Sequence, residues 1–261
     1  MTGEPVNTVS NDSWQHLRQY TAARIALGRT GGSQITGSVL DFRLSHARAR
    51  DAVHSAFNVD GLKHALRAQS IFTFGLATAA TDRHTYLLRP DLGRKLDSAS
   101  RQLLFANAPN WGRRDLAIIV SDGLAAQAAE QHATAILAPL IELLVASRWS
   151  LYPVFVVPLA RVKLQDEIGE LLGVRHTLML LGERPGLGSP DSLGAYFTHR
   201  PRAECTDADR NCISNIRPEG LPPFQAAEKI ARLLDESVRL GLSGVALKDT
   251  GLPSLQIAAQ T

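Results

Sequence analysis

Three short, continuous apolar runs in the second half of the chain most constrain its fold. They cover residues 116–120 (LAIIV), 151–157 (LYPVFVV) and 177–181 (TLMLL). Segments with helical periodicity lie between them, at 124–148 and 163–172. Apolar strands that alternate with helices indicate a parallel sheet covered on both faces. We therefore predict an α/β fold with a Rossmann-like parallel sheet.

Proline and glycine positions refine this outline. Pro139 falls inside the long helical segment, and we expect it to interrupt that helix because its ring clashes with the preceding turn. A last helix is predicted over 223–240, where apolar residues recur at helical spacing.

The first half of the chain is different in character. Its pattern predicts a mostly helical region, with strands at 70–78 and 84–88, a loop at 107–112, and helices at 14–27, 38–53, 60–69 and 91–106. We expect four parts: a disordered tail at 1–13, the helical region at 14–110, the Rossmann-like domain at 111–240, and a loose tail at 241–261.

Charge, hydropathy and cysteine usage exclude several classes of protein. The formal net charge is only +3 and the basic residues are spread along the chain, which argues against a nucleic-acid-binding protein. No run reaches the ~18 apolar residues that span a bilayer. The first residues lack the pattern of a secretory signal, so we expect a cytoplasmic protein whose two cysteines, Cys205 and Cys212, are free thiols.

Polar or glycine-rich segments follow each of the three apolar runs, at 121–123, 158–162 and 182–188. Ligands of open α/β sheets bind outside the carboxyl ends of the strands, so these loops predict a composite site. Ser121 and Asp122 could contact a ligand or cap the next helix. The 182–188 segment could bring its backbone and Glu183 to a ligand, or be a plain turn.

The motifs of most autonomous enzymes are missing. The chain contains no G-x-S-x-G elbow, no H-E-x-x-H metal pair, no G-x-G-x-x-G fingerprint and no Walker loop. None of its eight histidines is paired with a carboxylate at a catalytic spacing. A catalytic centre within this chain alone is therefore not supported.

Six segments together resemble the ethanolamine ammonia-lyase light chain. They are TAARIALGR at 21–29, RPDLGR at 89–94, SDGL at 121–124, RVKLQDEIG at 161–169, GERPGLG at 182–188 and DRNCISNI at 209–216. Each segment is weakly specific, but their number and order make the resemblance strong. It covers about residues 14–240.

The resemblance implies a small subunit of an adenosylcobalamin-dependent enzyme that converts ethanolamine to acetaldehyde and ammonia by a radical mechanism. Substrate would bind in a large catalytic subunit, with which residues 14–110 would dock. Residues 111–240 would contribute to the cobalamin site at the interface of this hetero-oligomer. Three positions match residues that contact cobalamin in the family: Val162, Glu183 and Cys212.

Cobalamin is expected to bind base-on, without a protein ligand to cobalt. Enzymes that bind cobalamin base-off carry an Asp-x-His-x-x-Gly motif. The nearest match here is Asp82-Arg-His84, but Leu87 stands at the position of the glycine, and the flanking residues are predicted to form a strand.

Family members often have a longer amino-terminal extension linked with packaging into a bacterial microcompartment. Only about a dozen residues precede the first predicted helix.

Two other interpretations share the predicted fold. One is a stand-alone nucleotide-binding enzyme, which would lack the usual glycine fingerprint and acidic ribose partner. The other is a scaffold in which the glycine-rich loops are only turns. Similar sheets serve many functions, so the fold does not distinguish these alternatives.

Overall fold

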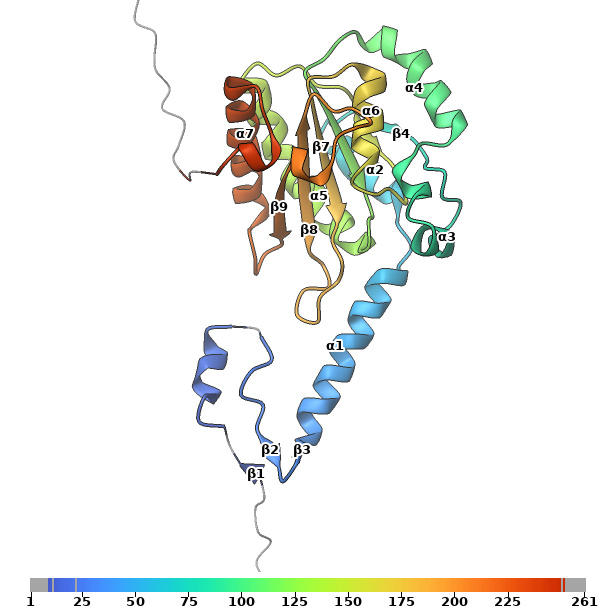
Figure 1. Ribbon diagram of the computed structural model, residues 1–261. Coiled ribbons are helices and arrows are strands. Elements are labelled where there is room, and N and C mark those ends of the chain that lie inside the picture. Colours follow the sequence, from blue (N-terminus) through green and yellow to red (C-terminus); the bar gives the residue numbers. More distant parts are fainter. Residues whose placement is uncertain (1–8, 11, 22, 250, 252–261) are drawn as a thin grey trace, which may run out of the picture.

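A mixed sheet of six strands forms the centre of the computed structural model, which describes residues 9, 10, 12–21, 23–249 and 251 (Figure 1). The strand order is β4-β6-β5-β7-β8-β9. Four strands are parallel: β4 (Thr73–Gly75), β6 (Val154–Val156), β5 (Leu116–Ser121) and β7 (His176–Gly182). The prediction of an α/β fold is confirmed.

The other two strands correct the expectation of a purely parallel sheet. β8 (Leu193–His199) pairs antiparallel with β7, and β9 (Arg210–Ile216) pairs antiparallel with β8. Only a short loop separates β7 from β8, so the chain returns directly alongside β7, as in a hairpin. The Rossmann-like character of the domain stays a prediction.

Helices cover both faces of the sheet, as the continuous apolar runs require. On one face α5 (Ala126–Ala146) and α7 (Pro223–Leu240) pack over Leu116, Ile118 and Val120 of β5. On the other, α4 (Ser98–Trp111) and α6 (Leu164–Leu172) pack over Ala117 and Ile119. Alternate residues of one strand enter different cores, so every residue must be apolar.

The predicted helices of the second half are found with small shifts, and α7 has the predicted bounds. The interruption at Pro139 is wrong, because α5 runs through it with Ile136, Leu137 and Leu140 fully buried. Burial on both sides of the proline outweighs the one backbone hydrogen bond that it removes.

Three local assignments before residue 112 are also wrong. The helix predicted over 14–27 is reduced to a short 3-10 helix, η1 (Gln15–Gln19), and residues 24–28 have no regular secondary structure. Residues 83–88 form a short helix, α3 (Arg83–Leu88), and not a strand, because the Asp82 side chain caps it by accepting from the Thr85 N–H at 2.8 Å. The helix predicted over 91–106 begins only at Ser98, after a short 3-10 helix η2 (Leu92–Arg94), and continues to Trp111 through the predicted loop.

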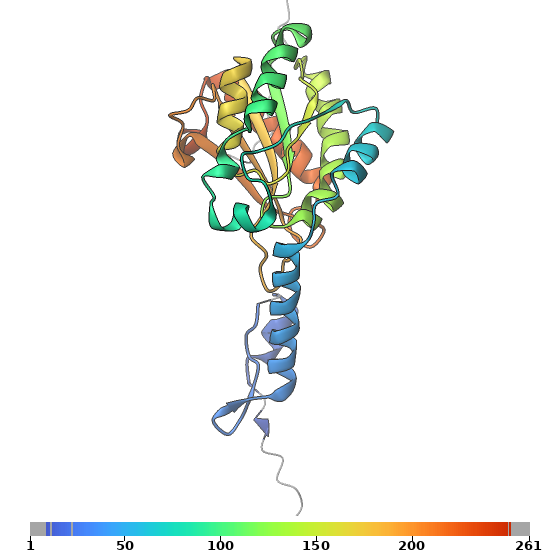
Figure 2. The same cartoon turned by 90° about the vertical axis from the view of Figure 1, so that its right-hand side faces the viewer.

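An extended arm leaves this α/β body (Figures 1 and 2). Its main element is α1 (Thr36–His54), in which only Ala52 is buried. A small antiparallel sheet of β1 (Val9–Ser10), β2 (Arg29–Thr30) and β3 (Ser33–Gln34) lies at the far end, and a 3-10 helix, η1 (Gln15–Gln19), lies back alongside α1. We call the described residues from 9 to 54 the arm.

Helix α2 (Val59–Ala68) joins the arm to the body and buries Leu62 and Leu66 in the same core as α5. It corresponds to the helix predicted at 60–69. The strand predicted at 70–78 is reduced to β4, which pairs with β6 although it precedes residue 110. The predicted domain boundaries stay a prediction, and most of the predicted tails, 1–13 and 241–261, lies outside the described residues.

Among the described helices, none is both long enough and apolar enough to cross a membrane.

Candidate functional site

A pocket of about 450 Å³ lies at the carboxyl ends of the parallel strands β5 and β7. Its lining includes Gly123 after β5, Arg161 after β6, Glu183 and Arg184 after β7, Tyr196 on β8 and Ser214 on β9. The loops that follow the three apolar runs therefore meet in one place, where ligands of open α/β sheets bind.

Glu183 is the first residue after β7 and is held firmly at the pocket. Its Oε2 accepts a hydrogen bond from the Ser192 hydroxyl and another, at 3.1 Å, from the Asn215 backbone N–H. The residue's own N–H donates to the Ser192 carbonyl at 2.9 Å. One carboxylate oxygen thus binds within the protein, and Oε1 remains beside Gly194 and Tyr196.

Tyr196 links the other two strands of the site. It lies directly opposite Cys212 in the β8–β9 pairing, so the two side chains are neighbours across the strands. Burial raises the pKa of the Tyr196 hydroxyl, and Cys212 and Glu183 raise it further. The tyrosine therefore stays neutral and is available as a donor. It was missed by the sequence analysis because β8 was missed, although the alternation in LGAYFTH is a strand signal.

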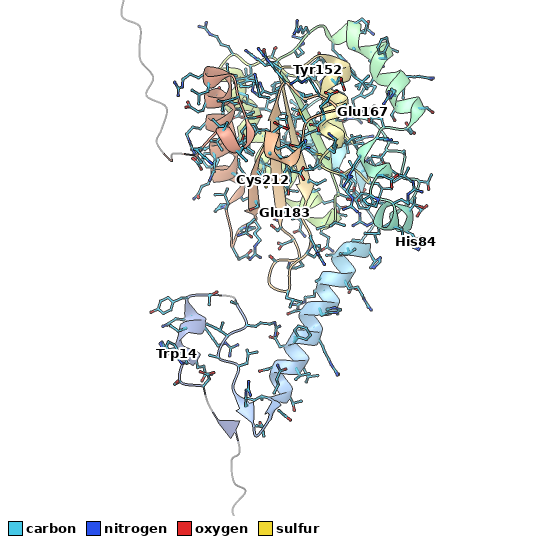
Figure 3. All side chains as sticks on the ribbon, viewed as in Figure 1. Trp14, His84, Tyr152, Glu167, Glu183 and Cys212 are labelled. Atoms are coloured by element: carbon cyan, nitrogen blue, oxygen red, sulfur yellow. The ribbon has the colours of Figure 1, made fainter. Side chains whose placement is uncertain are left out.

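Cys212 reaches the surface on β9, next to the pocket. Figure 3 shows it close to Glu183 on the sheet. Protein atoms around the sulfur raise the pKa of the Cys212 thiol by desolvation. The thiol therefore stays protonated, which disfavours metal ligation and nucleophilic reactions.

Val162 takes a different position from Glu183 and Cys212. It is half-buried in the turn before α6 and packs against the apolar core beneath α4 and α6. Its neighbour Arg161 lines the pocket in its place. The structure thus brings Glu183 and Cys212 together around Tyr196, whereas Val162 packs against the apolar core and does not line the pocket.

Ser121 and Asp122 use their side chains to join two loops. The Ser121 hydroxyl accepts from the Ala160 N–H at 3.0 Å, and Asp122 Oδ1 accepts from the Leu159 N–H at 2.6 Å. Neither caps α5, whose N-cap is Ala125 and has no side-chain hydrogen bond. Both are fully buried, so they fix the β5 and β6 loops relative to each other.

A buried ion pair joins the segments that carry Val162 and Cys212. Arg210 Nη1 lies 2.8 Å from both carboxylate oxygens of Asp166, and both side chains are almost fully buried. Burial raises the pKa of Asp166, while Arg210 and Lys163 favour its charged form. The pair locks α6 onto the start of β9 and so sets where Cys212 lies.

His84 lies apart from this site, exposed on α3 (Figure 3). Asp82 acts as the cap of that helix, and its hydrogen bonds to Thr85 and Thr81 lower its pKa to about 2. The described residues contain no group of three or more His, Cys, Asp or Glu side chains placed to hold a metal ion.

Fold and pocket together define an α/β protein with a polar binding pocket at the strand ends and an extended arm. Comparison with known sequences then identifies the family. The model of the ethanolamine ammonia-lyase light chain family matches residues 11–248. The chain belongs to this family.

Individual relatives agree with this assignment. The chain is 53% identical to the ethanolamine ammonia-lyase small subunit of Azotobacter vinelandii, over 92% of this chain and 89% of the relative. It is 51% identical to the protein of that name in Xanthomonas campestris pv. campestris, over 93% and 89%. The Pseudomonas putida protein of that name is 52% identical, over 92% and 88%.

Proposed function

We propose that the chain is the small subunit of a cytoplasmic, adenosylcobalamin-dependent ethanolamine ammonia-lyase and that its strand-end pocket forms part of the cobalamin site. The observation that carries this proposal is the position of Glu183. One of its oxygens is fixed inside the protein, while the other stays beside Tyr196 at a pocket built from six separate segments.

The chemistry of the pocket fits the periphery of cobalamin. Corrin side-chain amides donate hydrogen bonds, which Glu183 Oε1 can accept. The nucleotide tail carries a phosphate, for which Arg161 and Arg184 supply positive charge at the pocket. The Arg161 Nε is buried and has no hydrogen-bond partner among the described residues, so it is a donor suited to a ligand.

Base-on binding, without a protein ligand to cobalt, is part of the proposal. Cys212 lies opposite Tyr196 on β9, and the raised pKa of its thiol keeps it protonated. Since thiolates and not thiols ligate metals, Cys212 would pack against the cofactor. Val162 would act through the turn before α6, where its side chain packs against the core next to the pocket residue Arg161.

The cofactor, when bound, supplies an adenosyl radical through homolysis of its Co–C bond. The residues of this chain would bind and orient the cofactor and shield one side of it from water. Tyr196 and Cys212 stay protonated, so Tyr196 would act as a hydrogen-bond donor and Cys212 as a packing group, and neither as a base. Ethanolamine would bind and react in the large subunit.

The arm would dock with that large subunit. It exposes large apolar side chains, among them Trp14, Tyr20, Leu40, Phe42 and Leu44. Exposed apolar groups concentrated on one projecting element indicate a protein–protein interface. The relatives are named small subunits, which supports a large subunit as the occupant of this surface.

Deamination of ethanolamine in added adenosylcobalamin tests the proposal. We expect acetaldehyde only when this chain is mixed with the large subunit. If the mixture is inactive while both proteins are folded, the proposal is wrong and a stand-alone nucleotide-binding protein becomes the better interpretation.

A further inference from the structure

Arg83, the first residue of α3, connects the arm to the pocket. Its Nε donates to the Val53 carbonyl, in the last turn of α1, at 2.7 Å. Its Nη1 donates to Asp122 Oδ2 at 2.8 Å and to the Gly123 carbonyl at 2.7 Å. One guanidinium group therefore holds the end of the arm and the loop after β5.

The loop after β5, which accepts the Arg83 hydrogen bonds, forms part of the pocket wall. Gly123 of this loop lines the pocket and has a left-handed backbone with φ of 51°. A Cβ at this position would lie 2.2 Å from the Gly182 carbonyl oxygen, so the loop fits closely against the end of β7. Asp122 passes the constraint to the next loop through its bond to the Leu159 N–H.

The ion pair inside this connection is strongly shielded from water. The Asp122 side chain is 2% exposed and that of Arg83 is 17% exposed. Burial raises the pKa of Asp122, and the positive charge of Arg83 opposes that rise. Removing the arginine would leave a buried carboxylate without its cation, which is costly.

Arg83 also stacks on the wall of the pocket. Its guanidinium carbon lies 5.1 Å from the ring centre of Tyr86, and that of Arg161 lies 4.1 Å from the same ring. Both Tyr86 and Arg161 line the pocket. A movement of Arg83 would thus affect the pocket in two ways: through its hydrogen bonds to Asp122 and Gly123, and through its contact with the Tyr86 ring.

The arm approaches the site a second time, through the β7–β8 loop. Leu187 and Gly188 of that loop share a cavity of about 430 Å³ with Arg18, Arg24 and Leu27 of the arm. This loop starts at Glu183 and returns at Ser192, the two residues bonded to each other at the pocket.

We propose that Arg83 is a positioning residue that couples the arm to the pocket, so that seating of the arm on its partner sets the shape of the β5 loop and thereby the affinity for cofactor. The inference rests on the proposed function for the identity of partner and cofactor. Reciprocity follows: cofactor in the pocket would tighten association with the partner.

Hydrogen–deuterium exchange on the full-length chain tests the coupling without any cofactor. We expect Arg83→Gln to speed exchange both at the Leu159 amide and in the last turn of α1, with the β7–β8 amides unchanged. Arg239→Gln, at an exposed arginine paired with Glu236 on α7, is the matched control. If only one of the two segments responds, or neither does, the coupling is absent.

Arg83→Lys keeps the test valid if the glutamine variant does not fold. A lysine keeps a cation beside Asp122 but has a single nitrogen, so it cannot also hold the Val53 carbonyl in the same geometry. We expect faster exchange in the last turn of α1 and a smaller change at Leu159. Wild-type exchange in α1 would overturn the proposal.

Equilibrium dialysis of adenosylcobalamin against the assembled complex tests the consequence for binding. We expect Arg83→Gln to raise Kd about tenfold, with kcat at saturating cofactor within about twofold of wild type. Equal Kd in variant and wild type overturns the inference and leaves the proposed function standing. If the wild-type complex itself binds no adenosylcobalamin, the proposed function fails, while the exchange experiment still decides the coupling.

Discussion

Glu183 has two roles that make different demands on the same carboxylate. Its Oε2 satisfies the Ser192 hydroxyl and the Asn215 N–H, and so closes β8 and β9 around the pocket. Its Oε1 is the acceptor proposed for a corrin amide. A substitution at this residue therefore affects the shape of the site as well as its binding groups.

We expect Glu183→Ala to weaken adenosylcobalamin binding by the complex about tenfold or more, since a hydrogen bond to a charged group contributes about 1.5–3 kcal/mol. Glu183→Gln keeps an acceptor and should lose less. Dialysis against labelled cofactor measures both. Glu228→Ala, at an exposed residue of α7, is the control. Unchanged affinity in Glu183→Ala would remove this residue from the site.

Gly194 offers a second test at the same position. A Cβ there would lie 2.8 Å from Tyr196 Cε2 and 2.9 Å from Glu183 Oε1. We expect Gly194→Ala to displace these two side chains and weaken cofactor binding severalfold, without loss of the fold. Gly188→Ala, where a Cβ would meet nothing within 4 Å, should bind as wild type does. Equal affinities of the two variants would contradict the prediction.

At the scale of elements, the sequence predicts the buried strands well because each must be apolar on both faces. The runs at 116–120 and 177–181 lie within β5 and β7, and α5, α6 and α7 follow with small shifts. β8 and β9 were missed because polar residues such as Thr198 and Asn211 interrupt them. Thr198 is nonetheless buried, and Asn211 bonds to the backbone of residues 244 and 247.

The site was predictable to a similar degree. The loops that follow the three apolar runs do meet at one pocket, because parallel strands present their carboxyl ends at one edge. It did not distinguish side chains that face the pocket from side chains that tie loops together, such as Ser121 and Asp122. That difference depends on Arg83, a residue 39 positions from Asp122 in the chain, and no local pattern reveals it.

Substitutions in the arm should impair association with the large subunit without impairing the folding of this chain. Leu40 and Leu44 lie one turn apart on α1 and are 58% and 50% exposed. We expect the double variant Leu40→Ser/Leu44→Ser to lose association with the large subunit by at least tenfold and to keep its far-UV circular dichroism, because neither side chain belongs to a core. Analytical ultracentrifugation of the mixture measures the association.

A matched substitution outside the arm controls that experiment. Leu88 on α3 is 67% exposed, so Leu88→Ser removes a similar apolar area from another surface. It should associate as wild type does. If the arm variant also associates normally, the docking surface lies elsewhere on the body.

At the scale of the whole molecule, we expect a pair of histidines, one fully buried and one half-buried, to make folding dependent on pH. His176 is fully buried where β7, β8 and α7 meet, with its Nε2 2.9 Å from the Ser237 hydroxyl and 3.0 Å from His199 Nδ1. Burial, followed by His199 and Arg175, lowers the pKa of His176 to about 3. Burial also lowers the pKa of His199.

Because the pKa of His176 is lowered by folding, acid pH destabilises the folded protein. In the unfolded chain His176 takes up a proton as the pH falls below about 6.5, while in the folded chain it stays neutral down to about 3. Stability is therefore complete above about 6.5 and declines below it. At pH 5, His176 alone should cost about 2 kcal/mol of unfolding free energy.

Urea unfolding at pH 7.5 and pH 5 measures this loss. Between pH 7.5 and pH 5, we expect the free energy of unfolding of His176→Gln to fall by about 2 kcal/mol less than that of the wild-type protein. His64→Gln, at an exposed histidine of α2, should behave as wild type. Equal losses in His176→Gln and wild type would show that the pair is not the origin of the pH dependence.

The projecting arm also has a consequence for how a cell must handle this protein. A copy made without its partner displays Trp14, Tyr20 and the apolar side chains of α1 to the solvent, and such surfaces attract chaperones, proteases and other unassembled copies. Surplus chains would be removed or would aggregate. If the arm docks on a large subunit as proposed, production of the two chains in matched amounts would protect each new arm soon after its synthesis.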